Sequence, residues 1–256
     1  MIDTHSHIYS EEFDADRDEV IQRAKEAGVT KIVLPNVDAQ SLPRMLELEA
    51  QYPDYCYAAV GLHPESVKEN YQIELDIIRE ELERRKYLAV GEIGIDLYWD
   101  KTYQTEQIRA FQTQVEWAIE FNLPVIIHVR NSHNETIQAL KPYSGKGLKG
   151  IFHCFGGTPE EAAEIFSLGD FKLGIGGVVT FKNSGLAATL MHIPLEKLVL
   201  ETDSPYLTPV PFRGKRNESS YLRYVAARLS EIYAVPQDEV NRITTESANS
   251  VFSWLK

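Results

Sequence analysis

Histidines and carboxylates follow several short apolar runs in this 256-residue sequence, and both types of side chain bind metal ions. The candidates are His5, His7, His63, Glu92, His128, His153 and Asp203. A single histidine near a strand end is ordinarily a hydrogen-bonded core or loop residue. A whole set in equivalent positions is hard to explain as structure, because buried imidazoles and carboxylates need partners and a metal ion supplies one. The set predicts a metal centre.

The spacing of these residues supports a shared ion. His5 and His7 are two positions apart, so in an extended segment both side chains point the same way. Asp3 has the same parity, and we expect its carboxylate to orient an imidazole through the ring nitrogen that does not face the ion. Other same-face pairs are Glu201 with Asp203, Glu92 with Asp96, and His128 with Arg130. Imidazole and carboxylate together suit Zn, Mn, Fe, Ni or Co, whereas Mg prefers oxygen ligands.

Strand-like and helix-like segments alternate along the whole chain. The predicted strands are residues 1–3, 31–37, 55–62, 88–95, 124–129, 150–154, 171–175 and 198–202. The predicted helices are residues 16–27, 40–51, 75–85, 103–121, 134–140, 159–167, 185–191, 219–232 and 237–252. Eight strand and helix units in about 250 residues favour a closed (β/α)8 TIM barrel over an open doubly wound sheet, which is the alternative. In a barrel the candidates gather at the C-terminal ends of the strands, where barrel active sites lie.

Composition excludes several classes of protein. With 43% hydrophobic and 25% charged residues the chain is neither disordered nor fibrous, and no apolar run approaches a membrane span. No linker divides it, so we expect one domain over residues 1–256. Two cysteines and no signal-like N-terminus predict a cytoplasmic protein, which we expect to be a monomer. The net charge of −12 argues against a surface that binds nucleic acid everywhere, but allows a local site.

Five sequence blocks together resemble the signature of the TatD family of metal-dependent deoxyribonucleases. They are His5-Ser6-His7, Gly91-Glu92-Ile93-Gly94-Ile95-Asp96, His128-Val129-Arg130, His153-Cys154-Phe155 and Glu201-Thr202-Asp203-Ser204-Pro205-Tyr206-Leu207. The blocks occur in order, the first of them after Asp3-Thr4, and a Pro-Phe-Arg-Gly-Lys-Arg-Asn-Glu segment at Pro211 to Glu218 that also resembles the family follows the last. No single block would be sufficient, since a His-x-His pair is common to many amidohydrolase-like barrels.

The resemblance implies a (β/α)8 barrel with two divalent cations, Mg, Mn or Zn. It implies that His5, His7 and Asp203 hold one ion, that His128 and His153 hold the other, and that Glu92 bridges them. The expected activity is 3′-5′ exonuclease cleavage of single-stranded DNA by an activated water, with Glu92 and Asp203 as catalytic residues. Asp203 is the candidate to take the proton from this water.

Candidate substrate contacts lie beside these ligands. Arg130 is predicted to pair with a phosphate oxygen. The basic group Arg213, Lys215 and Arg216 follows Asp203 and is expected to overhang the same rim, although a solvated loop is the alternative. His63 is similar to a family position near the site, and we expect it to contact substrate instead of metal. Phe212 departs from the histidine or tyrosine that the resemblance leads us to expect.

Other residues are interpreted as structure. Trp99 and Tyr206 are candidates for stacking on bases, but a packing role is favoured for both. His133 and His192 are expected on the surface. Cys154 is expected to point away from His153, because neighbouring side chains alternate along a strand. Two further functions remain open, namely another hydrolase of the same barrel, acting on an aminoacyl-tRNA ester, lactone or amide, and a catalytically idle metal-binding protein.

Overall fold

Eight strands lie parallel to their neighbours in the computed structural model, which describes residues 1–254. They are β1 (Ile2–Asp3), β2 (Lys31–Pro35), β3 (Cys56–Ala59), β4 (Val90–Asp96), β5 (Val125–Arg130), β6 (Lys149–Phe152), β7 (Asp170–Ile175) and β8 (Leu198–Leu200). Each overlaps a predicted strand. Most are shorter than predicted, because the residues after them turn into loops at the rim.

The strands close into a barrel. Continuous pairing joins β1 to β3 and β4 to β8. A parallel bridge between Val60 and Val90 joins β3 to β4. On the other side, Thr4 N–H donates to the Leu200 carbonyl at 3.0 Å, and Ser6 forms a bridge with Ser204. The closed (β/α)8 barrel is therefore confirmed, and the open sheet is excluded.

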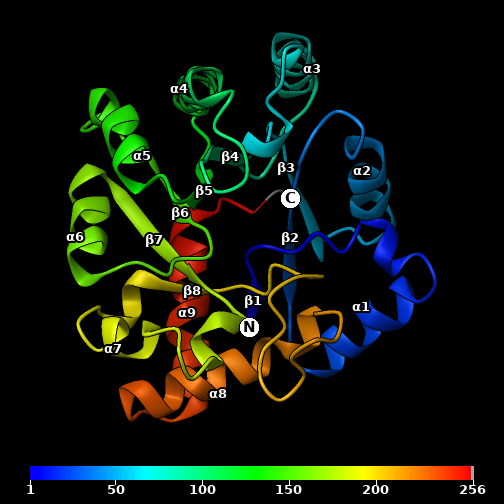
Figure 1. Cartoon of the computed structure of the whole chain (residues 1–256). Coiled ribbons are helices and arrows are strands. Elements are labelled where there is room, and N and C mark those ends of the chain that lie inside the picture. The colour runs from blue at the N-terminus through cyan, green and yellow to red at the C-terminus, as the bar shows by residue number, and fades with distance from the viewer. Residues whose placement is uncertain (255–256) are drawn as a thin grey trace.

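Helices surround the strands (Figure 1). They are α1 (Arg17–Glu26), α2 (Leu42–Gln51), α3 (Tyr71–Arg84), α4 (Gln104–Glu120), α5 (His133–Leu140), α6 (Pro159–Leu168), α7 (Leu186–Leu190), α8 (Leu222–Tyr233) and α9 (Gln237–Val251). Each overlaps a predicted helix. At α6 the local reason is visible, because Thr158 caps the helix, Glu161 closes a capping box and Pro159 occupies the first turn. None of the helices described is long and apolar enough to cross a membrane.

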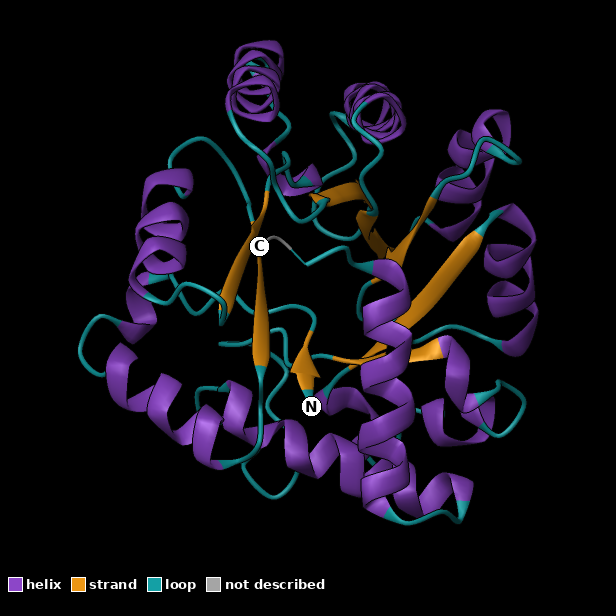
Figure 2. Cartoon of the chain, turned by 180° about the vertical axis from the view of Figure 1, so that it is seen from behind, coloured by secondary structure: helices purple, strands orange, loops and turns teal. Residues whose placement is uncertain are grey.

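Small and aliphatic side chains fill the inside of the barrel below the rim. The interior cluster includes Ile2, Val33, Ile126, Ile151 and Val199, one from each of five strands. The C-terminal end of α9 adds Ala248 and Val251 to this cluster, followed by Phe252. In Figure 2, seen from behind, α9 lies in front of the strands and covers this end of the barrel. The opposite end remains for the site.

Candidate metal centre

Strand alternation carries the candidate ligands into the barrel mouth. On β5, Ile126 belongs to the interior cluster, and His128 follows two residues later on the same face. Ile151 of β6 and His153, the residue directly after this strand, are also two positions apart. The segments after β1 and β8 are joined by hydrogen bonds, since Asp203 N–H donates to the His5 carbonyl at 2.9 Å. The same register that packs the core thus brings these side chains together.

Glu92 corrects one expectation. We expected it at the end of the fourth strand, but it is the third residue of β4 and only 2% exposed. The pairing of β4 with β5 shifts register between Val90 and Ile93, and Glu92 lies in this irregularity. Its carboxylate is therefore below the rim, where histidines from several strands surround it.

One set of four donor atoms has the spacing of ligands around a single ion. The Nε2 atoms of His5 and His7 are 3.1 Å apart, and they lie 3.0 and 3.5 Å from Oε2 of Glu92. They lie 3.8 and 3.7 Å from Oδ1 of Asp203. Ligands at ~2.1 Å from a tetrahedral ion would be separated by ~3.4 Å. The residues present therefore fit a metal ion at this point.

A second set faces the other oxygen of Glu92. Oε1 of Glu92 lies 2.9 Å from Nδ1 of His128, 3.5 Å from Nε2 of His63 and 3.8 Å from Nε2 of His153. Nε2 of His153 is also 3.8 Å from Oδ2 of Asp203. Both carboxylates thus direct one oxygen towards each set of histidines.

Hydrogen bonds to the outer ring nitrogens of His7 and His128 determine which nitrogen of each of these two rings faces the centre. Tyr9 donates its hydroxyl proton to the Pro35 carbonyl at 2.6 Å, so it accepts from Nδ1 of His7 at 3.0 Å, leaving Nε2 with its lone pair. Asp96 lies 3.0 Å from Nε2 of His128 and fixes that ring in the same way. Tyr9 shares the parity of His7, but spacing alone does not distinguish it as a partner of this ring.

A carboxylate also lies behind His153. Oε1 of Glu201 is 3.0 Å from its Nδ1, within ion-pair distance, and Nε2 faces the centre. Glu201 shares a face with Asp203, but spacing alone does not assign it this position. The chain therefore supplies a carboxylate behind two of the histidines, an arrangement common around metal ions.

His63 differs from these ligand candidates. Its Nδ1 accepts the backbone N–H of Glu65 at 3.1 Å, so in the neutral ring Nε2 carries the proton. A protonated nitrogen offers no lone pair to an ion. The atom that faces Glu92 is thus a hydrogen-bond donor.

Burial raises the pKa of both carboxylates and the neighbouring imidazoles lower it, but the net shift has opposite signs for Glu92 and Asp203. Burial alone raises the pKa of Glu92, but the surrounding imidazoles outweigh it and hold the pKa well below its usual range. Burial raises the pKa of Asp203 to about 6, although the imidazoles of His153 and His7 oppose the rise. Glu92 therefore stays ionised at neutral pH, as a metal ligand must.

Asp3 does not orient an imidazole, contrary to our expectation. Its carboxylate accepts the hydroxyls of Thr202 and Ser219, both at 2.7 Å, and the N–H of Thr202 at 3.0 Å. The reason is that β8 lies directly beside β1. Thr202, which follows β8, and Ser219 therefore occupy the hydrogen-bonding positions around the Asp3 carboxylate. Asp3 thus connects β1 by hydrogen bonds to the segment that follows β8.

Cys154 also departs from expectation. Strand β6 ends at Phe152, and Cys154 has a φ of 50°, so alternation does not extend to it. Its sulfur lies within 4.8 Å of donor atoms of His153 and Glu201 instead of pointing away. Burial, with carboxylates nearby, raises the pKa of the thiol well above its usual value, which favours the neutral form.

The predicted basic contacts have different environments. Arg213 stacks on Phe181 with its guanidinium carbon 3.7 Å from the ring centre, and Lys215 lies over Phe212 at 5.5 Å. Both are exposed. Arg216 is instead bound to Asp16 at 2.7 Å and belongs to the structure of this loop. Phe212 stacks on Tyr221 with ring centres 4.7 Å apart, which gives the aromatic ring a packing role.

The remaining predictions concern surface residues. His133 pairs with Glu164 at 2.8 Å, and His192 is exposed, as expected for both. Trp99 and Tyr206, interpreted as packing residues, are 70% and 56% exposed, so that interpretation is wrong. The ring of Tyr206 lies 6.5 Å from that of His7.

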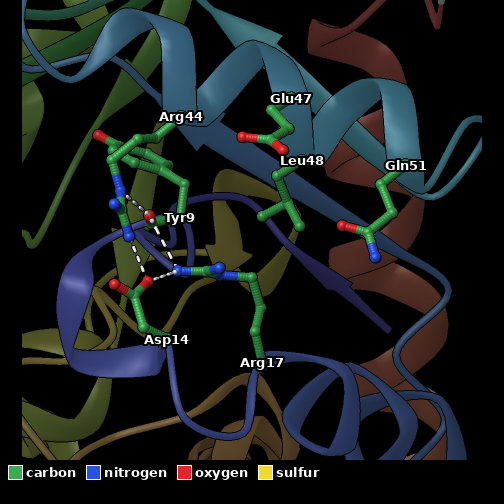
Figure 3. A pocket seen from close by; sticks show the side chains of 7 residues that line it. All are labelled: Tyr9, Asp14, Arg17, Arg44, Glu47, Leu48 and Gln51. Atoms are coloured by element: carbon green, nitrogen blue, oxygen red, sulfur yellow. Dashed lines mark hydrogen bonds and ion pairs between the residues drawn. The ribbon is translucent and has the colours of Figure 1, made fainter.

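A separate pocket lies between α1 and α2 (Figure 3). Figure 3 shows Arg17 and Arg44 converging on the carboxylate of Asp14. Backbone carbonyls of residues 8–10 accept further hydrogen bonds from both guanidinium groups. The two cations already have partners, so this pocket is a poor candidate for binding an anion.

A parallel (β/α)8 barrel with imidazoles and carboxylates converging at its mouth defines a class, the barrel metallohydrolases. Comparison with known proteins narrows this class. The family model for TatD related DNase matches residues 2–253. The chain belongs to the TatD family of metal-dependent hydrolases, enzymes that act on ester bonds.

Three relatives illustrate the likeness. An uncharacterised metal-dependent hydrolase, YabD of Bacillus subtilis, is 40% identical over 98% of both chains. The 3′-5′ ssDNA/RNA exonuclease TatD of Pectobacterium parmentieri is 33% identical over 98% of this chain and 99% of its own. The crystal structure of YjjV, a TatD homologue from Escherichia coli K12, has a TM-score of 0.93 at 33% identity, covering 100% of this chain and 98% of that chain.

Proposed function

We propose that this protein is a metal-dependent deoxyribonuclease that removes nucleotides from the 3′ end of single-stranded DNA. The observation that carries the proposal is Glu92, whose two oxygens each face a separate set of histidines. Such a carboxylate suits two ions placed side by side, the arrangement used for phosphodiester hydrolysis. Relatives over the whole chain are named as 3′-5′ exonucleases of single-stranded DNA and RNA.

The proposed ligands follow the two sets of donor atoms. His5, His7 and Asp203 would hold one divalent cation, His128 and His153 would hold the other, and Glu92 would serve both. The candidates are Mg, Mn or Zn, and the imidazole-rich donor set favours the latter two. Tyr9, Asp96 and Glu201 lie against the outer nitrogens of His7, His128 and His153, respectively.

The chain's own groups then have defined tasks. When bound, the ions lower the pKa of a coordinated water and stabilise charge on phosphoryl oxygens. Asp203 accepts the proton from the attacking water, because its oxygens lie at the border of both donor sets. His63 donates a hydrogen bond to substrate through Nε2.

The proposed phosphate contacts come from three basic residues. Arg130 ends β5, two residues beyond His128 on the same face. Arg213 and Lys215 extend from the loop after Asp203, and within residues 1–254 neither side chain forms an ion pair. Their charges give an acidic protein a local cationic surface.

The proposal is tested with single-stranded oligonucleotides labelled at either end. We expect shortening from the 3′ end with Mn, Zn or Mg, and no cleavage in EDTA. Absence of cleavage with every metal, in protein shown to contain metal, would favour an ester, lactone or amide substrate instead.

We also propose that residues 1–256 form one catalytic domain that acts as a monomer in the cytoplasm. The single closed barrel and the family match over residues 2–253 support one domain. Both cysteines are free thiols, which suits a reducing compartment. Sedimentation equilibrium measures the oligomeric state.

A further inference from the structure

An exposed aromatic cluster lies beside the proposed metal centre. Tyr98 and Trp99 follow β4, and their rings meet edge to face with centres 4.6 Å apart. Arg130 lies over both, with its guanidinium carbon 4.1 Å from the centre of Tyr98 and 5.3 Å from that of Trp99. Tyr98 is 50% and Trp99 70% exposed. We name these three residues the aromatic platform.

Backbone pairing places the aromatic platform next to the ligands. Arg130 is the register partner of Asp96, and Leu97 N–H donates to the Arg130 carbonyl at 2.9 Å. One oxygen of Asp96 accepts Tyr98 N–H at 2.9 Å, while the other contacts Nε2 of His128. A single carboxylate thus connects the platform to a metal-ligand candidate.

Packing alone does not explain the aromatic platform. Most of the Trp99 side chain faces solvent, where a large aromatic ring gains little from burial. Among the residues described, the guanidinium of Arg130 makes no hydrogen bond, and its nearest carboxylate is Glu65 at 3.8 Å. The site therefore offers an open ring face and unused donors together.

We propose that the aromatic platform binds a nucleobase of single-stranded nucleic acid while Arg130 contacts the adjoining phosphate. This inference rests on the proposed nuclease function and names where the strand lies. Every base has a π-face, so stacking on Trp99 tolerates any sequence. The cation beside the ring complements the charge of the strand, which the acidic protein otherwise repels.

The test compares an oligonucleotide of normal bases with one of equal length that carries abasic residues at its 3′ end. Binding is measured by fluorescence anisotropy with Mn, using strands whose linkages are cleavage-resistant phosphorothioates, so that Glu92 and the metal ligands stay intact. Trp99→Ala is expected to weaken binding of the normal strand about tenfold, from the usual energy of base stacking. Binding of the abasic strand should not change, and Trp99→Phe should keep most of the affinity.

Met191→Ala is the matched control, since Met191 is also an exposed large apolar residue, in the turn after α7. Equal losses on both strands, no loss on either, or no binding by the parent protein would overturn the inference. Base-dependent binding without cleavage by wild-type protein would leave the inference standing and refute the proposed nuclease function. Circular dichroism checks that each variant is folded.

Discussion

Glu92 contacts every histidine of both sets, so replacing it tests the whole proposed centre. Glu92→Gln keeps the volume but presents an amide to one set. We expect kcat to fall by more than about a hundredfold, the most that loss of an outer partner of a metal ligand costs. Metal content by elemental analysis should fall in parallel, and the circular dichroism spectrum should not change. Near wild-type turnover would refute the bridging role.

Tyr9 tests a contact outside the ligand sets. Tyr9→Phe removes the hydroxyl between His7 and the Pro35 carbonyl, so the His7 ring is free to rotate or change tautomer. We expect metal affinity to fall by about tenfold, as for other outer partners, with kcat recovering at saturating metal. Calorimetric metal titration measures the affinity. Tyr52→Phe, which removes a surface hydroxyl bonded to Asp18, is the control and should bind metal normally.

The close approach of β4 to β5 depends on Gly94. Its φ is 153°, and a Cβ there would lie 2.0 Å from the carbonyl oxygen of His128. Gly94→Ala should therefore lower the free energy of unfolding by about 3 kcal/mol or more, from strain and overpacking together. Urea denaturation measures the change.

Gly145→Ala is the control for Gly94→Ala, because it introduces backbone strain without a steric clash. Gly145 also has a positive φ, of 77°, but no heavy atom lies within 4 Å of the added carbon. We expect a loss of only about 1–2 kcal/mol, the cost of a left-handed residue with a side chain. Equal losses in the two variants would show that the contact between β4 and β5 is not the determining feature.

The features that the sequence could predict lie in or directly after regular helices and strands. Strand and helix alternation, with His128 and His153 two residues beyond apolar strand positions, was sufficient to predict the barrel and its rim. Irregular backbone accounts for the errors, because the depth of Glu92 depends on a register shift and the direction of Cys154 on a turn. Tyr9 was missed and Trp99 was interpreted as a packing residue, because spacing does not specify the contacts of the one or the exposure of the other.

At the scale of the whole molecule, the net charge of −12 should make the affinity for the proposed DNA substrate depend on metal and on salt. Two divalent cations would offset part of this charge at the barrel mouth, so we expect DNA binding to be weak without metal. If Arg130, Arg213 and Lys215 each contact one phosphate, log K should fall with log salt with a slope of about −2 for single strands. Arg130→Ala should reduce that slope by about 0.7, measured by anisotropy from 50 mM salt upward with cleavage-resistant phosphorothioate strands. Arg216→Ala should leave it unchanged, because Arg216 is bound to Asp16. Tight binding by metal-free protein, independent of salt, would contradict a cationic site at the rim.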